Sequence, residues 1–296
     1  MTTRAEPKDL PCEVLATAAP RLKRLVANRR GSTVWYIETD AGARAVKIGY
    51  PSRTHAHTAL APSREAHILR SLGADDVHDG QWAEGTWSIQ PWHGGLSLHD
   101  KWAECRRPGR ATPPDRPDAV AAATALADLH RTGWVHGDVQ PAHLILDATG
   151  ATLIDLGLAR GGYVPPRWDF PYRGCLVHYE APEIARSVLA HGTARPTRES
   201  DVYALGASLL ISATGWRHVA YPDDAPREEQ RRAVVENPHR PVTIAGDLGT
   251  VVDAMLSHRP ADRPTAAEVR DTLASGSGAS YDKGDGETGP GTGGTR

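Results

Sequence analysis

The feature that most constrains this chain is a pair of aspartates on two loops, each beside a short apolar run. Asp138 comes shortly before the run Leu144-Ile145-Leu146, and Asp155 directly follows Leu153-Ile154. Short apolar runs bounded by turn residues are typical of buried strands. The pattern therefore predicts two carboxylates presented on loops at strand ends, and Gly157 would let the chain turn sharply after the second.

Two carboxylates placed in this way suit phosphoryl transfer. That reaction needs a base beside the attacking hydroxyl and a ligand that holds magnesium against the phosphates, because positioning and charge neutralisation supply most of the catalysis. Asp138 is the candidate base and Asp155 the candidate Mg²⁺ ligand, since oxygen donors suit a hard cation. The alternative is that both aspartates only cap neighbouring turns.

A lysine and a glutamate upstream belong to the same set. Lys47 lies in the predicted strand Arg44–Ile48, where alternation sends it to one face. Glu65 lies on a predicted helix that begins at Pro62-Ser63 and ends at Gly73, so it is placed to pair with Lys47. An ordinary surface salt bridge is the alternative for this pair.

These motifs resemble those of the eukaryotic-type protein kinases, in a divergent form. The loop H-x-D-x-x-P followed by D-x-G is joined by Tyr179–Glu183, similar to the family's A-P-E motif, and by His258–Pro264, similar to its last arginine motif. The resemblance covers about Leu25 to Leu273. It implies an α+β fold of two lobes, with a small antiparallel β-sheet lobe that carries one helix and a larger, mainly helical lobe.

The resemblance also implies roles for single residues. Lys47 would reach the α- and β-phosphates of ATP, with Glu65 fixing its ammonium. In the larger lobe, Glu183 would pair with Arg263 and Asp201 would brace the loop that carries Asp138.

Alignment with the family's post-hinge glycines places the nucleotide base. Ile89 becomes the gatekeeper, and the segment Gln90-Pro91-Trp92 becomes the hinge. The carbonyl of Gln90 and the N–H and carbonyl of Trp92 would meet the purine, while Pro91 stands where no N–H is needed. Val34 is the valine that follows the glycine-rich loop.

The glycine-rich loop itself departs from the family. Ala27, Arg29 and Ser32 stand where glycines are usual, and only Gly31 remains. Side chains would hinder backbone approach to the phosphates. Either Arg29 or Arg30 contacts phosphate through its guanidinium, or this segment is a solvated turn.

The loop after Asp138 also departs from the family. His143 replaces the asparagine that binds the second Mg²⁺, which predicts either a single metal on Asp155 or a preference for Mn²⁺ with His143 as a ligand. Gln140 replaces a lysine near the transferred phosphate. Both changes lower the activity that we expect.

No serine or threonine lies between Asp155 and Glu183, and Gly137 replaces the arginine that receives an activation-loop phosphate in the family. Only Tyr163, Tyr172 and Tyr179 could be phosphorylated there. We therefore expect constitutive activity or activation by a partner protein.

Composition excludes several classes of function. The 34 basic and 36 acidic residues give a net charge of −2, which implies no binding to nucleic acid or to an anionic membrane. Three cysteines without metal-site or disulfide spacing, together with no apolar signal or membrane-spanning run, predict a cytoplasmic protein. The scarcity of lysine among the basic residues suggests a high-GC bacterial genome.

The chain divides into four predicted parts. These are an N-terminal leader (1–23), a kinase-like N-lobe (24–90), a kinase-like C-lobe (91–274) and a disordered Gly/Ser/Thr-rich tail (275–296).

The predicted function is ATP-dependent transfer of the γ-phosphoryl group to a serine or threonine of a protein or precursor peptide. The H-G-D-x-Q-P loop also resembles kinase-like proteins of lanthipeptide biosynthesis, in which a separate lyase partner eliminates the phosphate. One alternative is a pseudokinase scaffold that binds a peptide or partner enzyme. Another is a small-molecule kinase of the aminoglycoside type, which shares the H-G-D loop but usually lacks the A-P-E and final arginine motifs.

Overall fold

Five strands near the N-terminus form an antiparallel sheet in the order β1-β2-β3-β5-β4. The computed structural model describes residues 9–29, 31–52, 56–109 and 112–276. Side chains alternate across the sheet, so the facing pair Val34 and Lys47 lies on one face, while the neighbouring Trp35 and Val46 lie in an apolar cluster on the other. The strands are β1 (Leu22–Arg29), β2 (Ser32–Thr39), β3 (Gly42–Gly49), β4 (His78–Trp82) and β5 (Gly85–Pro91).

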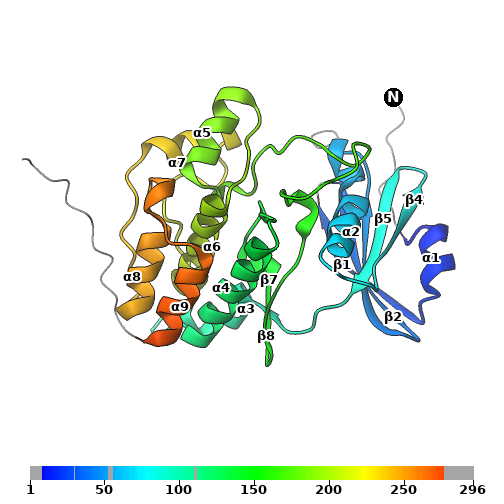
Figure 1. Cartoon of the computed structure of the whole chain (residues 1–296), viewed down its shortest axis with the longest axis horizontal. Coiled ribbons are helices and arrows are strands. Elements are labelled where there is room, and N and C mark those ends of the chain that lie inside the picture. The colour runs from blue at the N-terminus through cyan, green and yellow to red at the C-terminus, as the bar shows by residue number, and fades with distance from the viewer. Residues whose placement is uncertain (1–8, 30, 53–55, 110–111, 277–296) are drawn as a thin grey trace, which may run out of the picture.

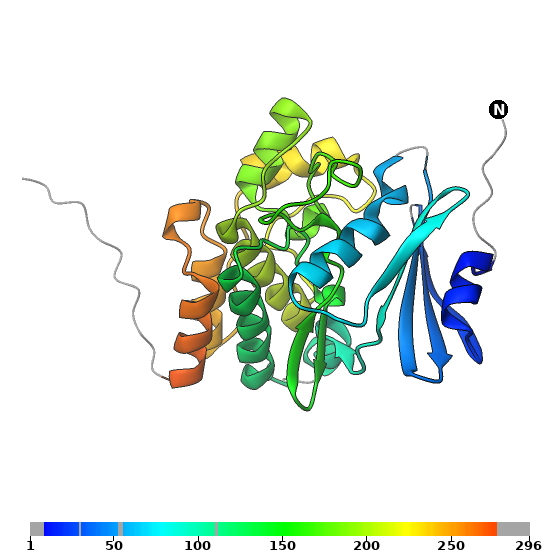
Figure 2. The ribbon, with the colours of Figure 1, turned by 45° about the vertical axis from the view of Figure 1, so that its right-hand side comes forward.

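Two helices cover opposite faces of this sheet (Figures 1 and 2). Helix α2 (Ala61–Ser71) has Pro62 in its first turn, where the missing N–H does no harm, and faces the second lobe. Helix α1 (Cys12–Ala18) lies on the outer face, where Leu10 and Val14 join the apolar cluster. The predicted leader 1–23 therefore differs from the structure, because from residue 9 onward this segment is part of the N-lobe.

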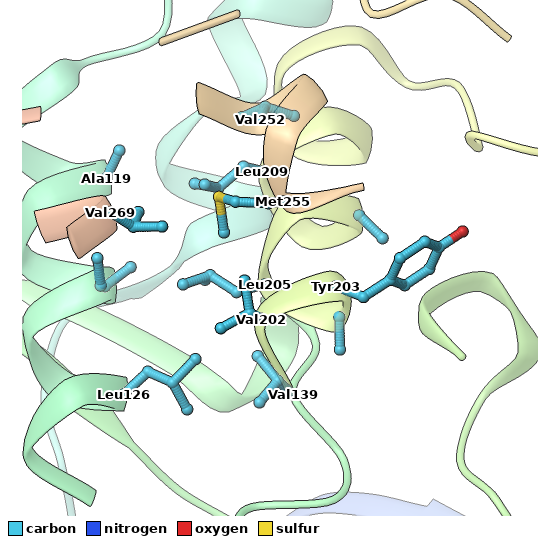
Figure 3. Close-up of a cluster of buried hydrophobic side chains, with 14 of the residues drawn as sticks. Ala119, Leu126, Val139, Val202, Tyr203, Leu205, Leu209, Val252, Met255 and Val269 are labelled. Carbon is cyan, nitrogen blue, oxygen red and sulfur yellow. The ribbon is translucent and has the colours of Figure 1, made fainter. Parts of the chain in front are cut away.

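The second lobe is mainly helical, and most of its buried apolar side chains form one large cluster. Figure 3 shows Leu126 of α4, Leu205 and Leu209 of α6, and Met255 of α8 around its centre. The helices are α3 (Leu98–Lys101), α4 (Arg116–Arg131), α5 (Pro182–His191), α6 (Arg198–Thr214), α7 (Arg227–Glu236), α8 (Gly246–Met255) and α9 (Ala266–Ser275).

A small sheet at the junction of the lobes carries the two aspartates. It has the order β6-β7-β8, with β6 (Leu96–Ser97), β7 (Leu144–Asp147) and β8 (Gly150–Leu153). The loop of Asp138 runs into β7 and Asp155 follows β8, as the apolar runs predicted. Single 3₁₀ turns occur at η1 (Ala56–Ala59), η2 (Ala103–Arg106), η3 (Pro141–His143), η4 (Leu156–Leu158), η5 (Val177–Tyr179) and η6 (Pro260–Asp262).

The architecture is the α+β fold of two lobes that the resemblance implied. Among the described residues, no helix is both long and apolar enough to cross a bilayer. The predicted tail lies outside the described residues beyond Gly276, and Ser275 still belongs to α9.

Candidate active site

Lys47 lies between two carboxylates at the junction of the lobes. Its Nζ is 2.7 Å from Oε2 of Glu65 on α2 and 3.0 Å from Oδ1 of Asp155 after β8. Lys47 and Glu65 are both buried. Although burial disfavours the charged ammonium, the charges of Asp155 and Glu65 outweigh it and raise the pKa of Lys47, so this lysine is cationic at neutral pH. The pair is therefore no surface salt bridge.

Asp155 has an unusual backbone conformation. Its φ of 67° and ψ of 56° place it in the left-handed region, which is uncommon for a residue other than glycine. Gly157 was the residue expected to make the sharp turn, but it lies in η4 and is not among the glycines with positive φ. Burial alone would raise the pKa of the Asp155 carboxyl, but Lys47 and His143 hold it well below its usual range.

The loop of Asp138 is fixed from beneath by Asp201 of α6. Its carboxylate accepts hydrogen bonds from the backbone N–H groups of His136 (2.6 Å) and Gly137 (2.9 Å). Gly137 has a φ of 76°, which favours glycine over the usual arginine. Burial lowers the pKa of His136 to about 4, so its ring is neutral and supports the loop through the carbonyl of Ile154.

Asp138 has one free carboxylate oxygen. Oδ2 accepts a 3.3 Å hydrogen bond from the amide of Gln140, while Oδ1 is buried and has no hydrogen-bond partner among the described residues. Burial raises the pKa of Asp138 to about 7, with Asp155 adding to this effect and His143 opposing it. A carboxylate with a pKa near neutrality suits a general base.

His143 joins the two aspartates. Its Nδ1 lies 2.9 Å from the backbone carbonyl of Asp138, and its Nε2 lies 3.2 Å from Oδ2 of Asp155. Because a carbonyl only accepts, Nδ1 carries a proton. Nε2 lies 3.2 Å from the side-chain amide nitrogen of Gln140 as well, so the ring stands beside Asp155 at the place where that carboxylate could hold a cation.

The structure corrects the prediction of which residues surround the nucleotide base. Ser88 faces Lys47 across the β3–β5 pair, and Gln90 faces Ala45. These side chains therefore lie on the face of the sheet that carries Lys47, which we call the cleft face. Ile89 lies in the outer apolar cluster and cannot be a gatekeeper. The N–H of Trp92 already donates to the carbonyl of Ala43.

The predicted glycine-rich loop is a tight hairpin. Arg29 pairs with Ser32, which leaves two residues for the turn. Gly31 has a φ of 88°, and an added Cβ would lie 2.7 Å from the carbonyl oxygen of Tyr50. Arg29 is exposed, whereas Arg30 lies outside the described residues. Val34 faces Lys47 and is half-buried on the cleft face.

Comparison with known families decides the classification. The protein kinase domain matches residues 119–273, more than half of the 296-residue chain. The chain belongs to the protein kinase domain family. This match lies within the C-lobe. The resemblance in the sequence begins earlier, near Leu25, and the N-lobe of this kinase domain is described from the structure.

Similar proteins include bacterial kinases. Serine/threonine-protein kinase PknK of Mycobacterium tuberculosis is 32% identical over 167 residues, which cover 52% of this chain and 14% of PknK. PkaA of Streptomyces coelicolor is 32% identical over 152 residues, covering 50% of this chain and 26% of PkaA. PknB of M. tuberculosis is 32% identical over 176 residues, with 56% and 26% covered. The aligned part thus spans about a quarter or less of these relatives.

Two ion pairs, one partly buried and one buried, hold the C-terminal part of the activation segment of this kinase domain. Arg263 donates to both carboxylate oxygens of Glu183, at 2.7 and 2.9 Å, in the pairing that the resemblance implied. Arg231 of α7 likewise binds both oxygens of Glu180, at 2.6 and 3.0 Å. No sequence motif singled out Arg231, because it lies outside the motifs that carry the resemblance, whereas Glu183 and Arg263 belong to them.

The three tyrosines of the segment differ in accessibility. Tyr172 is only 4% exposed, and its hydroxyl donates to the carbonyl of Gly137. Tyr179 is half-buried, whereas Tyr163 is 74% exposed. Of these candidates only Tyr163 is open to a modifying enzyme without rearrangement.

Proposed function

We propose that this kinase domain transfers the γ-phosphoryl group of ATP to a serine or threonine hydroxyl of a protein or peptide. The observation that carries the proposal is the buried ammonium of Lys47 between Glu65 and Asp155, with the unpartnered Oδ1 of Asp138 on the neighbouring loop. Family membership supports the reaction type, and the bacterial relatives named as serine/threonine kinases support the acceptor class.

Each of the four side chains has a proposed role. Lys47 holds the α- and β-phosphates, and Glu65 keeps its ammonium in place. Asp138 orients the acceptor hydroxyl through Oδ1 and takes its proton as the new O–P bond forms and the bond between the γ-phosphorus and ADP breaks. Asp155 would hold the divalent metal.

The charges of the site fit a divalent cation. Asp155 has a side chain that is 44% exposed, and its negative charge and that of Glu65 lie beside the single ammonium of Lys47. The described residues contain no cluster of three or more metal-binding side chains. This agrees with Mg²⁺, which usually takes one or two carboxylates and completes its shell with phosphates and water. A bound metal would neutralise charge on the phosphates, and Asp155 would hold it. With His143 as a second ligand, the site would favour Mn²⁺.

The nucleotide base would lie against the cleft face of the sheet. Val34 and Ala45 share this face with Lys47. The N–H of Trp92 is already engaged, so we propose that the backbone N–H of His93, the next residue, binds the purine. The carbonyl of Pro91 would accept a hydrogen bond from the purine. The side-chain amide of Gln90 faces the cleft.

The acceptor that we propose is a serine or threonine of a precursor peptide in lanthipeptide biosynthesis, with a lyase as partner in the cytoplasm. The support is the resemblance of the H-G-D-x-Q-P loop to kinase-like proteins of such pathways. Free Cys12, Cys105 and Cys175 agree with a reducing compartment.

The test is transfer from γ-labelled ATP with Mg²⁺ or Mn²⁺ to candidate peptides that carry serine or threonine. Label on the hydroxyl, lost in Asp138→Asn, is the expected result. ATP binding without transfer to any peptide would favour a pseudokinase scaffold, an alternative that the tight hairpin and His143 support. Label on an aminoglycoside but never on a peptide would favour a small-molecule kinase, which the Gly137-Asp138 motif supports and the Glu183–Arg263 pair opposes.

A further inference from the structure

Helix α2 contains a completely buried arginine directly before Glu65. Arg64 has an exposed fraction of 0%, although an arginine is seldom buried without strong partners. It is among the largest fully buried side chains of the described residues. Such a cation in the interior needs a compensating arrangement, so its contacts reveal what it does.

The partners of Arg64 all belong to the segment that follows Asp155. Its two terminal nitrogens donate to the backbone carbonyls of Gly157 (3.0 Å) and Ala159 (2.8 Å). Its guanidinium also lies 5.3 Å from the centre of the Phe170 ring, and Asp169 lies 3.7 Å away. One side chain of α2 therefore binds both the turn after Asp155 and a later part of the activation segment.

The neighbouring Glu65 binds the same turn. Besides Lys47, Oε1 of Glu65 accepts a 3.2 Å hydrogen bond from the N–H of Leu156. The turn η4 is thus held at three backbone positions by two consecutive side chains of α2. Because each backbone group is fixed in space, the direction in which the chain leaves Asp155 is fixed too.

This matters because Asp155 has a backbone conformation that an aspartate adopts only when its surroundings impose it. A left-handed residue of this kind persists where neighbouring contacts over-determine the chain. The same conformation directs Oδ1 to Lys47 and Oδ2 to His143. Loss of the contacts on η4 would release the aspartate into ordinary conformations that point elsewhere.

We propose that Arg64 is a positioning residue for phosphoryl transfer: it holds the turn after Asp155 so that Asp155 stays directed into the site without any phosphate on the activation segment. The role in transfer rests on the proposed function. It also explains how a segment without serine or threonine stays in place, since a buried guanidinium provides the anchor from α2 that a phosphate would otherwise supply.

The test compares Arg64→Met with Arg70→Met in the full chain. Arg70 is on the same helix and also donates to a backbone carbonyl and a carboxylate, those of Val77 and Asp79, but it does not contact the segment after Asp155. In Arg64→Met we expect amide hydrogen exchange at Leu156 and Ala159 to rise by about tenfold or more, while the helices of the C-lobe keep their protection. Arg70→Met should leave both amides unchanged.

The kinetic readout separates positioning from a general structural role. We expect kcat of Arg64→Met to fall about tenfold or more, with the KM for the acceptor little changed. Faster exchange throughout the molecule, or unchanged exchange at Leu156 and Ala159, would overturn the proposal. Should Arg64→Met not fold, Arg64→Lys replaces it; that variant keeps the charge but not the planar fork, and the same two amides decide.

The two proposals can fail separately. Wild-type protein that binds ATP but transfers no phosphate overturns the proposed function. The exchange measurement needs no turnover, so it still shows whether Arg64 holds the turn after Asp155.

Discussion

The floor and the roof of the cleft differ in how they are built. In the floor, Asp201 accepts two hydrogen bonds from the backbone of the Asp138 loop, Gln140 donates to Asp138, and Lys47 donates to Asp155. The roof is the β1–β2 hairpin, in which Ala27, Arg29 and Ser32 stand where the family has glycines. Under the proposed function, this difference places the residues assigned to phosphoryl transfer in the floor, while the backbone grip that glycines would give on the phosphates is reduced in the roof. Changes in the floor should therefore act on kcat, and changes in the roof on the KM for ATP.

The largest expected effect comes from the two aspartates of the floor. Asp138→Asn and Asp155→Asn should each reduce kcat roughly a thousandfold, because each removes a charge that acts on the reacting groups. Single-turnover kinetics with labelled ATP would measure this. Melting temperatures close to that of the wild type are the control, and wild-type turnover in both variants would refute the assigned roles.

The next effect is the dependence on pH. Because the pKa of Asp138 is raised to about 7 and a base must be unprotonated, kcat/KM should fall about tenfold per pH unit below pH 7. The free energy of unfolding should depend on pH in the opposite direction. The folded state keeps the proton of Asp138 where the unfolded chain has lost it, so this group makes stability fall as pH rises from about 4 to 7.

Asp138→Asn provides the control for that stability trend. Denaturant unfolding at several pH values should show a smaller loss of stability over this range in the variant. Equal slopes for variant and wild type would show that Asp138 does not titrate near neutrality.

A smaller effect is expected at His143, which touches both aspartates of the floor. His143→Asn should raise the Mg²⁺-supported rate about threefold and reduce any preference for Mn²⁺, because an amide oxygen suits Mg²⁺ better than imidazole does. Rates measured with each metal over a range of concentrations would show it. An unchanged metal preference would mean that His143 serves only to support the loop.

The smallest effect is expected in the roof. Arg29→Ala should raise the KM for ATP by about twofold and leave kcat unchanged, since an exposed charge contributes little. Arg21→Ala, at an exposed residue before the same strand, is a matched control. A large loss in kcat from Arg29→Ala would mean that the roof takes part in the chemistry after all.

The floor could be predicted from the sequence because its motifs are local. The apolar runs before and after the two loops place Asp138 and Asp155, and the resemblance supplied Asp201 as the brace. The residues of the roof could be predicted less well from the sequence. The alignment with the family's glycines put Ile89 in the cleft, whereas the β3–β5 register, which no sequence pattern shows, places Ser88 and Gln90 there.

Two other features had no usable signal in the sequence. Helix α1 buries only Val14 within its own span, which is too little to show a helical pattern. Arg64 belongs to a residue type that is rarely buried, and its acceptors are backbone carbonyls more than 90 positions away. Contacts of that kind depend on the tertiary fold and leave no motif.

Helix α1 has a practical consequence for work with shortened chains. A polypeptide begun at β1 would lack Leu10 and Val14, which cover Trp35, Ile37 and Val46 on the outer face of the sheet. Uncovering this apolar face favours aggregation. A truncated protein that precipitates or loses ATP binding would then reveal a missing cover and say nothing about the chemistry of the cleft.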